Sequence, residues 1–483
     1  MSGAAIFVKK DLKISDVEIE VLVGILNLYS LVGSALAGRT SDWIGRRRTI
    51  ILAASIFFFG ALLMGFATNY AFLMAGRFVA GIGVGYALVI APVYTTELAP
   101  SSSRGFLTSF PEVFINAGIM LGYVSNYAFS KLSLHLGWRL MLGIGAIPSI
   151  FLGIGVWRMP ESPRWLIMQG RLGEGKRVLE KTSESKEEAA SRLADIKEAA
   201  GIPQSCDEER VDNDQMRKRK HGEGVWRELL LTPTPAVRRI LVAAVGLHFF
   251  QQSSGIDAVV LYSPRIFEKA GIKGNDPLLG ATVAVGFIKT LTILIATFLV
   301  DKKGRRFLLL CSCGGVIAAL ITLATCLTLI DNHPNQGKTT MTWALVLCIL
   351  MVLVYVSFFS LGLGPVTWVY GSEIFPLRLR AQGVSLCIAV NRVTSGVLTM
   401  TFISLYKRIT IGGAFYLYAG IATVAWLFFY ALLPETRGST LEDTQRLFHN
   451  SNWRRQRKEE EVQLELARPT NKDDHLSSSQ LQP

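Results

Sequence analysis

Apolar runs long enough to cross a lipid bilayer recur along most of the chain. Half of the residues are hydrophobic and only 18% are charged, and a helix of ~20 apolar residues spans the ~30 Å hydrocarbon core of a membrane. Inside that core the backbone must satisfy its own hydrogen bonds, and these long runs fit helices rather than the short alternating strands of a barrel. We therefore predict an all-α polytopic membrane protein. About eleven spans are expected, near residues 19–38, 50–67, 72–95, 107–129, 138–157, 238–262, 279–300, 307–330, 343–369, 383–405 and 413–433.

Three short motifs occur twice, in the same order, and indicate that the chain contains two related halves. They begin at Asp42, Glu97 and Pro160 in the first half, and at Asp301, Glu373 and Pro434 in the second. Duplicated helical halves with a binding site at the membrane midplane are typical of secondary transporters. The predicted organisation is a remnant of a helix or extracellular loop at 1–18, a helical half at 19–157, a cytoplasmic linker with short helices at 158–237, a second helical half at 238–433, and a mostly disordered cytoplasmic tail at 434–483.

Lysine and arginine concentrate in every second loop, which the positive-inside rule assigns to the cytoplasm. The basic loops include residues 39–48, the linker 158–237 and residues 302–306, whereas Lys407-Arg408 is an exception on the other side. The formal net charge of +13 is therefore interpreted as membrane topology beside anionic lipid. Nucleic-acid binding is not expected, because no basic stripe is interleaved with exposed aromatic residues.

The predicted spans are uneven in number, with five before the linker and six after it. An intact pair of six-helix halves would need one more helix before Met1. The first residues have neither the basic start nor the length of a signal peptide. Two interpretations follow: the chain starts inside a longer reading frame that encodes the first helix, or it is a natural short isoform.

No motif for covalent chemistry or metal binding occurs in the sequence. Of the six cysteines, five lie in predicted spans and one in the linker, without the paired spacing of a zinc site. The sequence also contains no Ser/His/Asp set and no phosphate-binding loop. The glycines between Gly81 and Gly85 lie inside a predicted span, where they favour close helix packing. We predict that the protein is not an enzyme and that it uses no cofactor or metal.

Six motifs follow one another between residue 19 and about residue 445: Gly76-Arg77-Phe78, Pro92-Val-Tyr94-Thr-Thr-Glu97, Pro160-Glu-Ser-Pro-Arg164-Trp165, Gln251-Gln252-Ser-Ser-Gly255, Gly362-Leu-Gly364-Pro365-Val-Thr-Trp368 and Pro434-Glu-Thr-Arg-Gly438. In this order, they resemble the motifs of the sugar porter family of the major facilitator superfamily, most closely its plant polyol/monosaccharide transporters. The resemblance implies a twelve-helix-type fold that carries its substrate by alternating access, in the plasma membrane. It also implies proton-driven uptake in intact members, whose first helix, expected to be missing from this chain, carries a proton-coupling Asp.

The same resemblance places substrate-binding residues on the spans of the second half: Gln251, Gln252, Asp257, Tyr262, Trp368 and Asn391. Amides and carboxylates suit a row of substrate hydroxyls, and the indole supplies an apolar plate. Three positions depart from the hexose carriers, because Glu112 replaces a Gln and both Asp257 and Lys289 replace Asn. Charged groups inside a membrane are costly unless they are paired or hydrated. Asp257 and Lys289 therefore either neutralise each other or form a charged, hydrogen-bonding wall that selects linear polyols as well as sugar rings.

The two intramembrane carboxylates are also the candidates for proton coupling. We expect Glu112 to be the proton-sensitive group and Asp257 to be a fixed acceptor for the sugar.

The repeated loop motifs predict a cytoplasmic lattice of ion pairs between helix ends. Its expected members are Asp42, Arg46, Glu97, Arg104, Glu161, Arg164, Asp301, Arg305, Glu373, Arg380 and Glu435. Rocking of the two halves would have to break some of these pairs, so the lattice would bias a two-state equilibrium toward the outward-open state. The alternative is that these charges only anchor the topology.

The predicted function is transport of polyols and monosaccharides, with proton symport in the intact form. The rival interpretations are a truncated, non-transporting sugar sensor or regulatory isoform, and an uncoupled facilitator. The expected partners are a polyol or monosaccharide, protons and the lipid bilayer. The sequence indicates neither a nucleic-acid partner nor a particular oligomeric state.

Overall fold

The computed structural model describes residues 2–100, 104–200, 202–203, 227–270, 274–332, 340–376 and 379–436. Every regular element in these residues is helical, so the all-α prediction is confirmed. The first half contains α1 (Ser2–Leu12), α2 (Asp16–Ile44), α3 (Arg46–Gly65), α4 (Tyr70–Leu98), α5 (Arg104–Phe129), α6 (Leu134–Gly143) and α7 (Ala146–Trp157). The linker contains α8 (Pro163–Met168), α9 (Leu172–Thr182), α10 (Lys186–Ala200) and the π-helix η1 (Arg227–Leu231). The second half contains α12 (Pro235–Ser253), α13 (Ile256–Ala270), α14 (Asn275–Lys303), α15 (Arg305–Asn332), α16 (Thr340–Phe358), the π-helix η2 (Phe359–Leu363), α17 (Gly364–Glu373), α18 (Arg380–Ile409) and α19 (Ile411–Leu432).

Ten segments in the described part of the chain are helical, long and apolar enough to cross a membrane. They coincide with the predicted spans except for 238–262, which is divided between two helices that are not among the ten. α12 ends at Ser253 and α13 begins at Ile256. Gly255 between them has a φ of +85°, and a Cβ at this position would lie 2.9 Å from the Tyr418 ring. Because glycine alone adopts this conformation readily, the chain breaks here, a feature that hydropathy does not detect.

In both halves, a glycine with a positive φ separates two consecutive helices. Gly45 separates α2 from α3 with a φ of +97°, and Gly304 separates α14 from α15 with a φ of +93°. Both positions belong to the first repeated motif, and both need glycine because positive φ values strain other residues. The duplication in the sequence is therefore also a duplication of tight helix breaks.

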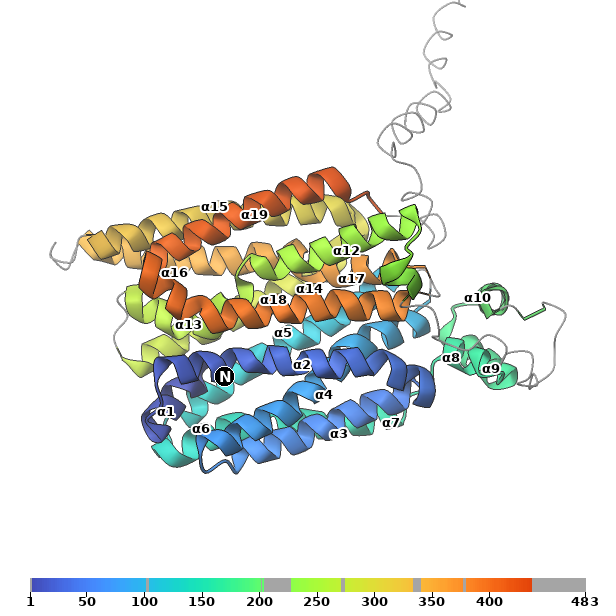
Figure 1. Ribbon diagram of the computed structural model, residues 1–483, viewed down its shortest axis with the longest axis horizontal. Helices are drawn as coiled ribbons and strands as arrows, with labels where there is room; N and C mark the ends of the chain where they lie inside the picture. Colours follow the sequence, from blue (N-terminus) through green and yellow to red (C-terminus); the bar gives the residue numbers. More distant parts are fainter. Residues whose placement is uncertain are drawn as a thin grey trace, which may run out of the picture.

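The long helices run side by side in one bundle (Figure 1), and the two halves contact each other along α2 and α18 and along α5 and α14. The short helices α8, α9 and α10 project from one end of the bundle, and α1 lies at the other. Because the basic linker marks the cytoplasmic side, we assign the end with α1 to the outside. Large apolar side chains such as Phe59, Phe151 and Trp157 are exposed, which is the outer surface expected of a protein that lies in lipid.

Candidate functional site

The break between α12 and α13 contacts a second irregular segment, the end of the π-helix η2. Gln251, near the end of α12, donates to the carbonyl oxygens of Leu363 at 3.0 Å and Gly364 at 3.3 Å. Tyr355 on α16 donates to the carbonyl oxygen of Ser254 at 3.0 Å. Irregular backbone at membrane depth needs such partners, because lipid offers none. These contacts join the two helix breaks into one polar region.

Asn391 on α18 extends this polar region. Its Nδ2 donates to Gln251 Oε1 at 2.8 Å and to the carbonyl oxygen of His248 at 3.2 Å. Trp368 on α17 is half-buried, and its ring meets the ring of His248 edge to face with 5.6 Å between centroids. Two predicted amides and the predicted indole therefore lie within one group of contacts.

Gln252 and Asp257 belong to a hydrogen-bond network that joins the two halves. The Gln252 amide, oriented with its oxygen 3.0 Å from Arg392 Nη2, donates to Asp257 Oδ2 at 3.1 Å. Asp257 also accepts a short hydrogen bond from the Ser395 hydroxyl. Asn27 donates to Ser395 Oγ at 2.8 Å and accepts from Arg392 Nη1 at 3.4 Å. Because Asn27 lies on α2 and the other residues lie in the second half, the network connects the halves at the level of the helix break.

Glu112 on α5 and Lys289 on α14 are charged residues that are only 8% and 5% exposed. Asn116 donates to Glu112 Oε1 at 3.2 Å, and the same oxygen would lie 3.4 Å from a Cβ placed on Gly364. Thr290, next to Lys289, donates to the carbonyl oxygen of Asn116 at 3.3 Å, so α5 and α14 pack together at the level of these two charges. Among the described side chains, no ion pair within 4.0 Å joins Lys289 to either carboxylate. Glu112 and Lys289 are therefore buried on two helices that pack together, without direct contact between their charged groups.

Tyr262 lies on α13, but its hydroxyl is engaged outside this network. It donates to the carbonyl oxygen of Thr399 at 2.9 Å. Its ring stacks on that of Phe402, with 5.4 Å between centroids. In this conformation Tyr262 packs α13 against α18.

The cytoplasmic end of the first half contains a cluster centred on Arg46. Its guanidinium lies 3.1 Å from Glu97 and 3.0 Å from Asp42. Glu161, just before α8, accepts from the backbone N–H groups of Arg46 at 2.9 Å and Arg47 at 3.0 Å. A carboxylate at the start of α3 is also favoured by the helix dipole. The cluster thus holds together the ends of α2, α3 and α4.

The second half contains the matching cluster. Arg305 lies 3.2 Å from Glu373, and Glu435 accepts from the backbone N–H groups of Arg305 at 2.9 Å and Arg306 at 3.0 Å. The repeated motifs therefore make equivalent contacts in both halves.

Of the other residues expected in the lattice, Arg380 and Arg164 lie among the described residues. Arg380 donates to the carbonyl oxygen of Phe375 at 3.3 Å, and Arg164 is half-buried on α8. The side chains of Arg104 and Asp301 lie outside the described residues.

At the opposite end of the bundle, Asp16 is the centre of a cluster of three ion pairs. Its carboxylate lies 2.5 Å from Lys9 on α1, 3.3 Å from Arg265 on α13 and 2.9 Å from Lys407 on α18. Two of these partners belong to the second half. The cluster therefore connects the two halves outside the membrane. It also gives an acidic partner to Lys407, the basic residue that departs from the positive-inside pattern.

Glu20, one turn further along α2, makes a second connection at this end. It is only 3% exposed, and its carboxylate accepts from the backbone N–H and the hydroxyl of Ser404 on α18, both at 2.8 Å. Charge-assisted hydrogen bonds of this kind are stronger than neutral ones. The outer ends of α2 and α18 are thus held together in this conformation.

Comparison with known proteins decides the family. The sequence model of the Sugar (and other) transporter family matches residues 5–448. The chain belongs to this family. Within the sugar transporter family, it is 64% identical to Polyol transporter 5 of Arabidopsis thaliana over 454 residues, which cover 94% of this chain and 83% of that protein. The protein is thus a multi-pass membrane transporter and not an enzyme, as predicted.

Solved structures of sugar transporters confirm the fold. The proton:xylose symporter XylE, a member of the major facilitator superfamily bound to 6-bromo-6-deoxy-D-glucose, matches with a TM-score of 0.77 and 27% identity, covering 92% of this chain and 94% of that chain. The inward open conformation of XylE from E. coli matches with a TM-score of 0.68 and 25% identity over the same shares. The predicted major facilitator fold is therefore confirmed, and this sugar transporter is more similar to the sugar-bound structure than to the inward-open one.

Several polar residues of these clusters are not part of the sequence-based prediction, among them Asn27, Ser395, Asp16 and Glu20. Asn27, Glu20 and Ser395 lie within predicted membrane spans, where a polar side chain by itself indicates a functional contact. That signal could have identified them as candidates. It could not have identified their partners, which lie on helices of the other half.

Proposed function

We propose that this sugar transporter carries linear polyols and monosaccharides by alternating access. The observation that supports the proposal is the network of Gln251, Gln252, Asp257 and Asn391 beside the helix break, where the halves meet. A row of substrate hydroxyls needs donors and acceptors at short intervals, which amides and carboxylates provide. Trp368 offers an apolar face for the carbon-bound hydrogens between those hydroxyls.

The substrate class is favoured by both the relatives and the charges of the site. The most similar proteins include Polyol transporter 5 of Arabidopsis thaliana, and the solved neighbours include a xylose symporter. An open-chain polyol presents a hydroxyl on each carbon, and additional charged acceptors and donors suit such a ligand. Glu112, Asp257 and Lys289 would supply this polar wall.

Alternating access requires that contacts between the halves break at one end while they hold at the other. We propose that the Asp16 cluster and Glu20 form the outer gate. At the cytoplasmic end, the Arg46–Glu97 and Arg305–Glu373 pairs each lie within one half and keep its helix ends together while that half moves. A gate made of a few ion pairs and hydrogen bonds biases the equilibrium by a few kcal/mol, which substrate binding can overcome.

We further propose proton symport across the plasma membrane, with Glu112 as the proton-accepting group. Glu112 is buried and titratable, and its helix α5 packs against α14, which carries Lys289, so a change in the protonation of Glu112 alters the charge balance of the site. The solved neighbour XylE is a proton:xylose symporter. The rival functions are an uncoupled facilitator and a non-transporting sugar sensor.

Uptake of labelled sorbitol, xylitol and glucose by cells that lack their own carriers tests the proposal. Gln251→Ala should reduce uptake about tenfold or more, because it removes buried hydrogen bonds worth ~1–3 kcal/mol. Gln169→Ala, at an exposed cytoplasmic position, is the matched control and should leave uptake unchanged. Uptake that survives collapse of the proton gradient would favour the uncoupled facilitator. Sugar binding without any uptake would favour the sensor. Surface labelling of intact cells tests the plasma-membrane location.

A further inference from the structure

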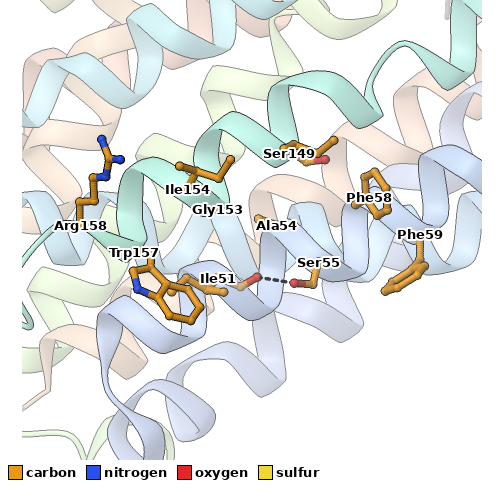
Figure 2. A pocket seen from close by; sticks show the side chains of 11 residues that line it. Ile51, Ala54, Ser55, Phe58, Phe59, Ser149, Gly153, Ile154, Trp157 and Arg158 are labelled. Atoms are coloured by element: carbon orange, nitrogen blue, oxygen red, sulfur yellow. Dashed lines mark hydrogen bonds between the residues drawn. The ribbon is translucent and has the colours of Figure 1, made fainter.

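A groove runs along the outer surface of the first half, between α3 and α7 (Figure 2). Ile51, Ser55 and Phe58 line it on α3, and Gly153, Ile154 and Trp157 line it on α7. These positions recur at helical spacing, so the groove follows both helix axes. The nine residues of α3 from Ile51 to Phe59 span ~12 Å along the helix axis, at a rise of 1.5 Å per residue. Because both helices are membrane spans, the groove opens to lipid.

The lining of the groove is effectively apolar. The Ser55 hydroxyl donates to the carbonyl oxygen of Ile51 at 2.9 Å, and the Ser149 hydroxyl donates to that of Ala146 at 2.7 Å. Both hydroxyls are therefore satisfied within their own helices. A long apolar groove without free polar groups suits a hydrocarbon chain rather than a polar solute.

The cytoplasmic end of the groove is basic. Figure 2 shows Arg158 at one end of the row of side chains, with Phe58 and Phe59 at the other. Arg158 is exposed, and no carboxylate within 4.0 Å pairs with it among the described residues. Arg47, in the first turn of α3, donates a short hydrogen bond to the carbonyl oxygen of Trp157. The next residue, Arg48, is exposed, so two exposed guanidinium groups occur near this end.

In the described part of the chain, the acid closest in sequence, Glu161, forms no ion pair with Arg158. Glu161 Oε1 accepts from the backbone N–H groups of Arg46, Arg47 and Ser162 at 2.9–3.0 Å. Trp157, 68% exposed, lies beside Arg158 at the position where aromatic residues meet the lipid headgroups. Toward the cytoplasm, the apolar groove is therefore followed by the indole of Trp157 and then by the guanidinium of Arg158.

We propose that this groove binds an anionic glycerophospholipid of the cytoplasmic leaflet. One acyl chain lies between α3 and α7, and the headgroup phosphate is held by Arg158, with Arg48 adding attraction. Guanidinium groups bind phosphate through paired, charge-assisted hydrogen bonds, and the cytoplasmic leaflet is the one rich in anionic lipid. The site is separate from the substrate network and does not depend on the proposed function.

Lipid titration of the purified full chain, followed by native mass spectrometry, tests the headgroup contact. The probes are phosphatidylserine and phosphatidylcholine with identical acyl chains. The unmodified chain should bind phosphatidylserine more tightly. Arg158→Gln should weaken phosphatidylserine binding about fivefold, the factor expected for one basic residue at an anionic lipid surface, and leave phosphatidylcholine binding unchanged. Arg238→Gln, which removes the same charge at another exposed helix end, is the control. Equal effects of the two substitutions, or equal binding of the two lipids, would overturn the headgroup assignment.

Two glycines on α7 provide a matched test of the acyl-chain contact. A Cβ on Gly153 or on Gly155 would meet no atom within 4 Å, so both tolerate a larger side chain, but only Gly153 lines the groove. Gly153→Leu should weaken binding of both lipids about fivefold or more, and Gly155→Leu should not. Equal lipid binding by these two variants would show that the groove is not occupied, and would leave only attraction to the surface charge.

Discussion

Replacement of Asp16 by asparagine should loosen the extracellular end of the bundle. Of its three ion pairs, those with Arg265 at 3.3 Å and Lys407 at 2.9 Å cross between the halves. The side chains are partly exposed, 31% for Asp16 and 54% for Lys407, so each pair is worth ~0.5 kcal/mol rather than the value of a buried pair. Two such pairs stabilise the closed outer end by ~1 kcal/mol, which is about a fivefold factor in the open-to-closed ratio.

A cysteine in place of Thr399 reports on this opening. Thr399 on α18 is 0% exposed, and its Oγ1 would lie 2.8 Å from a Cβ placed on Gly24 of α2, so its side chain faces the other half. In a background without the six native cysteines, a membrane-impermeant thiol reagent should modify this cysteine about fivefold faster in Asp16→Asn. A rise in salt from ~0.1 M to ~1 M shortens the screening length from ~10 Å to ~3 Å. It should therefore accelerate modification when Asp16 is present and have little effect in the variant.

Glu18→Gln is the matched control. It removes a carboxylate two residues away, whose hydrogen bonds in the described structure are confined to Ser15 in the capping box of α2. The rate of modification should stay near that of the unmodified chain. Equal rates in Asp16→Asn and Glu18→Gln, or a rate that does not respond to salt, would refute the assignment of Asp16 to the outer gate.

Three further predictions concern the helix breaks and the substrate site. Gly45→Ala should lower the thermal unfolding temperature, because a φ of +97° strains alanine and its Cβ would lie 2.5 Å from Glu161 Oε2. The strain should reduce the free energy of unfolding by at least ~1–2 kcal/mol. Gly38→Ala, whose added Cβ meets no atom within 4 Å, is the control and should not lower the unfolding temperature. Glu112→Gln should flatten the dependence of polyol uptake on pH, since the titratable carboxyl is lost, and a profile like that of the unmodified chain would contradict its role in proton coupling. Asp257→Asn should raise the KM for sorbitol about tenfold, because it removes charge-assisted hydrogen bonds of ~1.5–3 kcal/mol; an unchanged KM would remove it from the substrate site.

The sequence by itself determined the class of fold and the duplication. Hydropathy is a local property of the chain, and ~20 apolar residues in lipid have little choice but to form a helix. The repeated motifs that begin at Asp42 and Asp301 predicted equivalent loops, and Gly45 and Gly304 break the helices there in the same way. By resemblance, the sequence also identified Gln251, Gln252 and Asn391, which the structure brings into one hydrogen-bond network.

Only the tertiary structure decided which polar groups meet across the bundle. Asn27 contacts Ser395 and Asp16 contacts Lys407, across 368 and 391 positions of the chain. Lipid does not favour one apolar helix face over another, so helix partners in a membrane are selected by close packing and by hydrogen bonds between distant segments. Such pairings leave no periodic trace in the sequence. The same reason explains why the groove between α3 and α7, which is formed by the packing of two apolar spans, became visible only in the folded bundle.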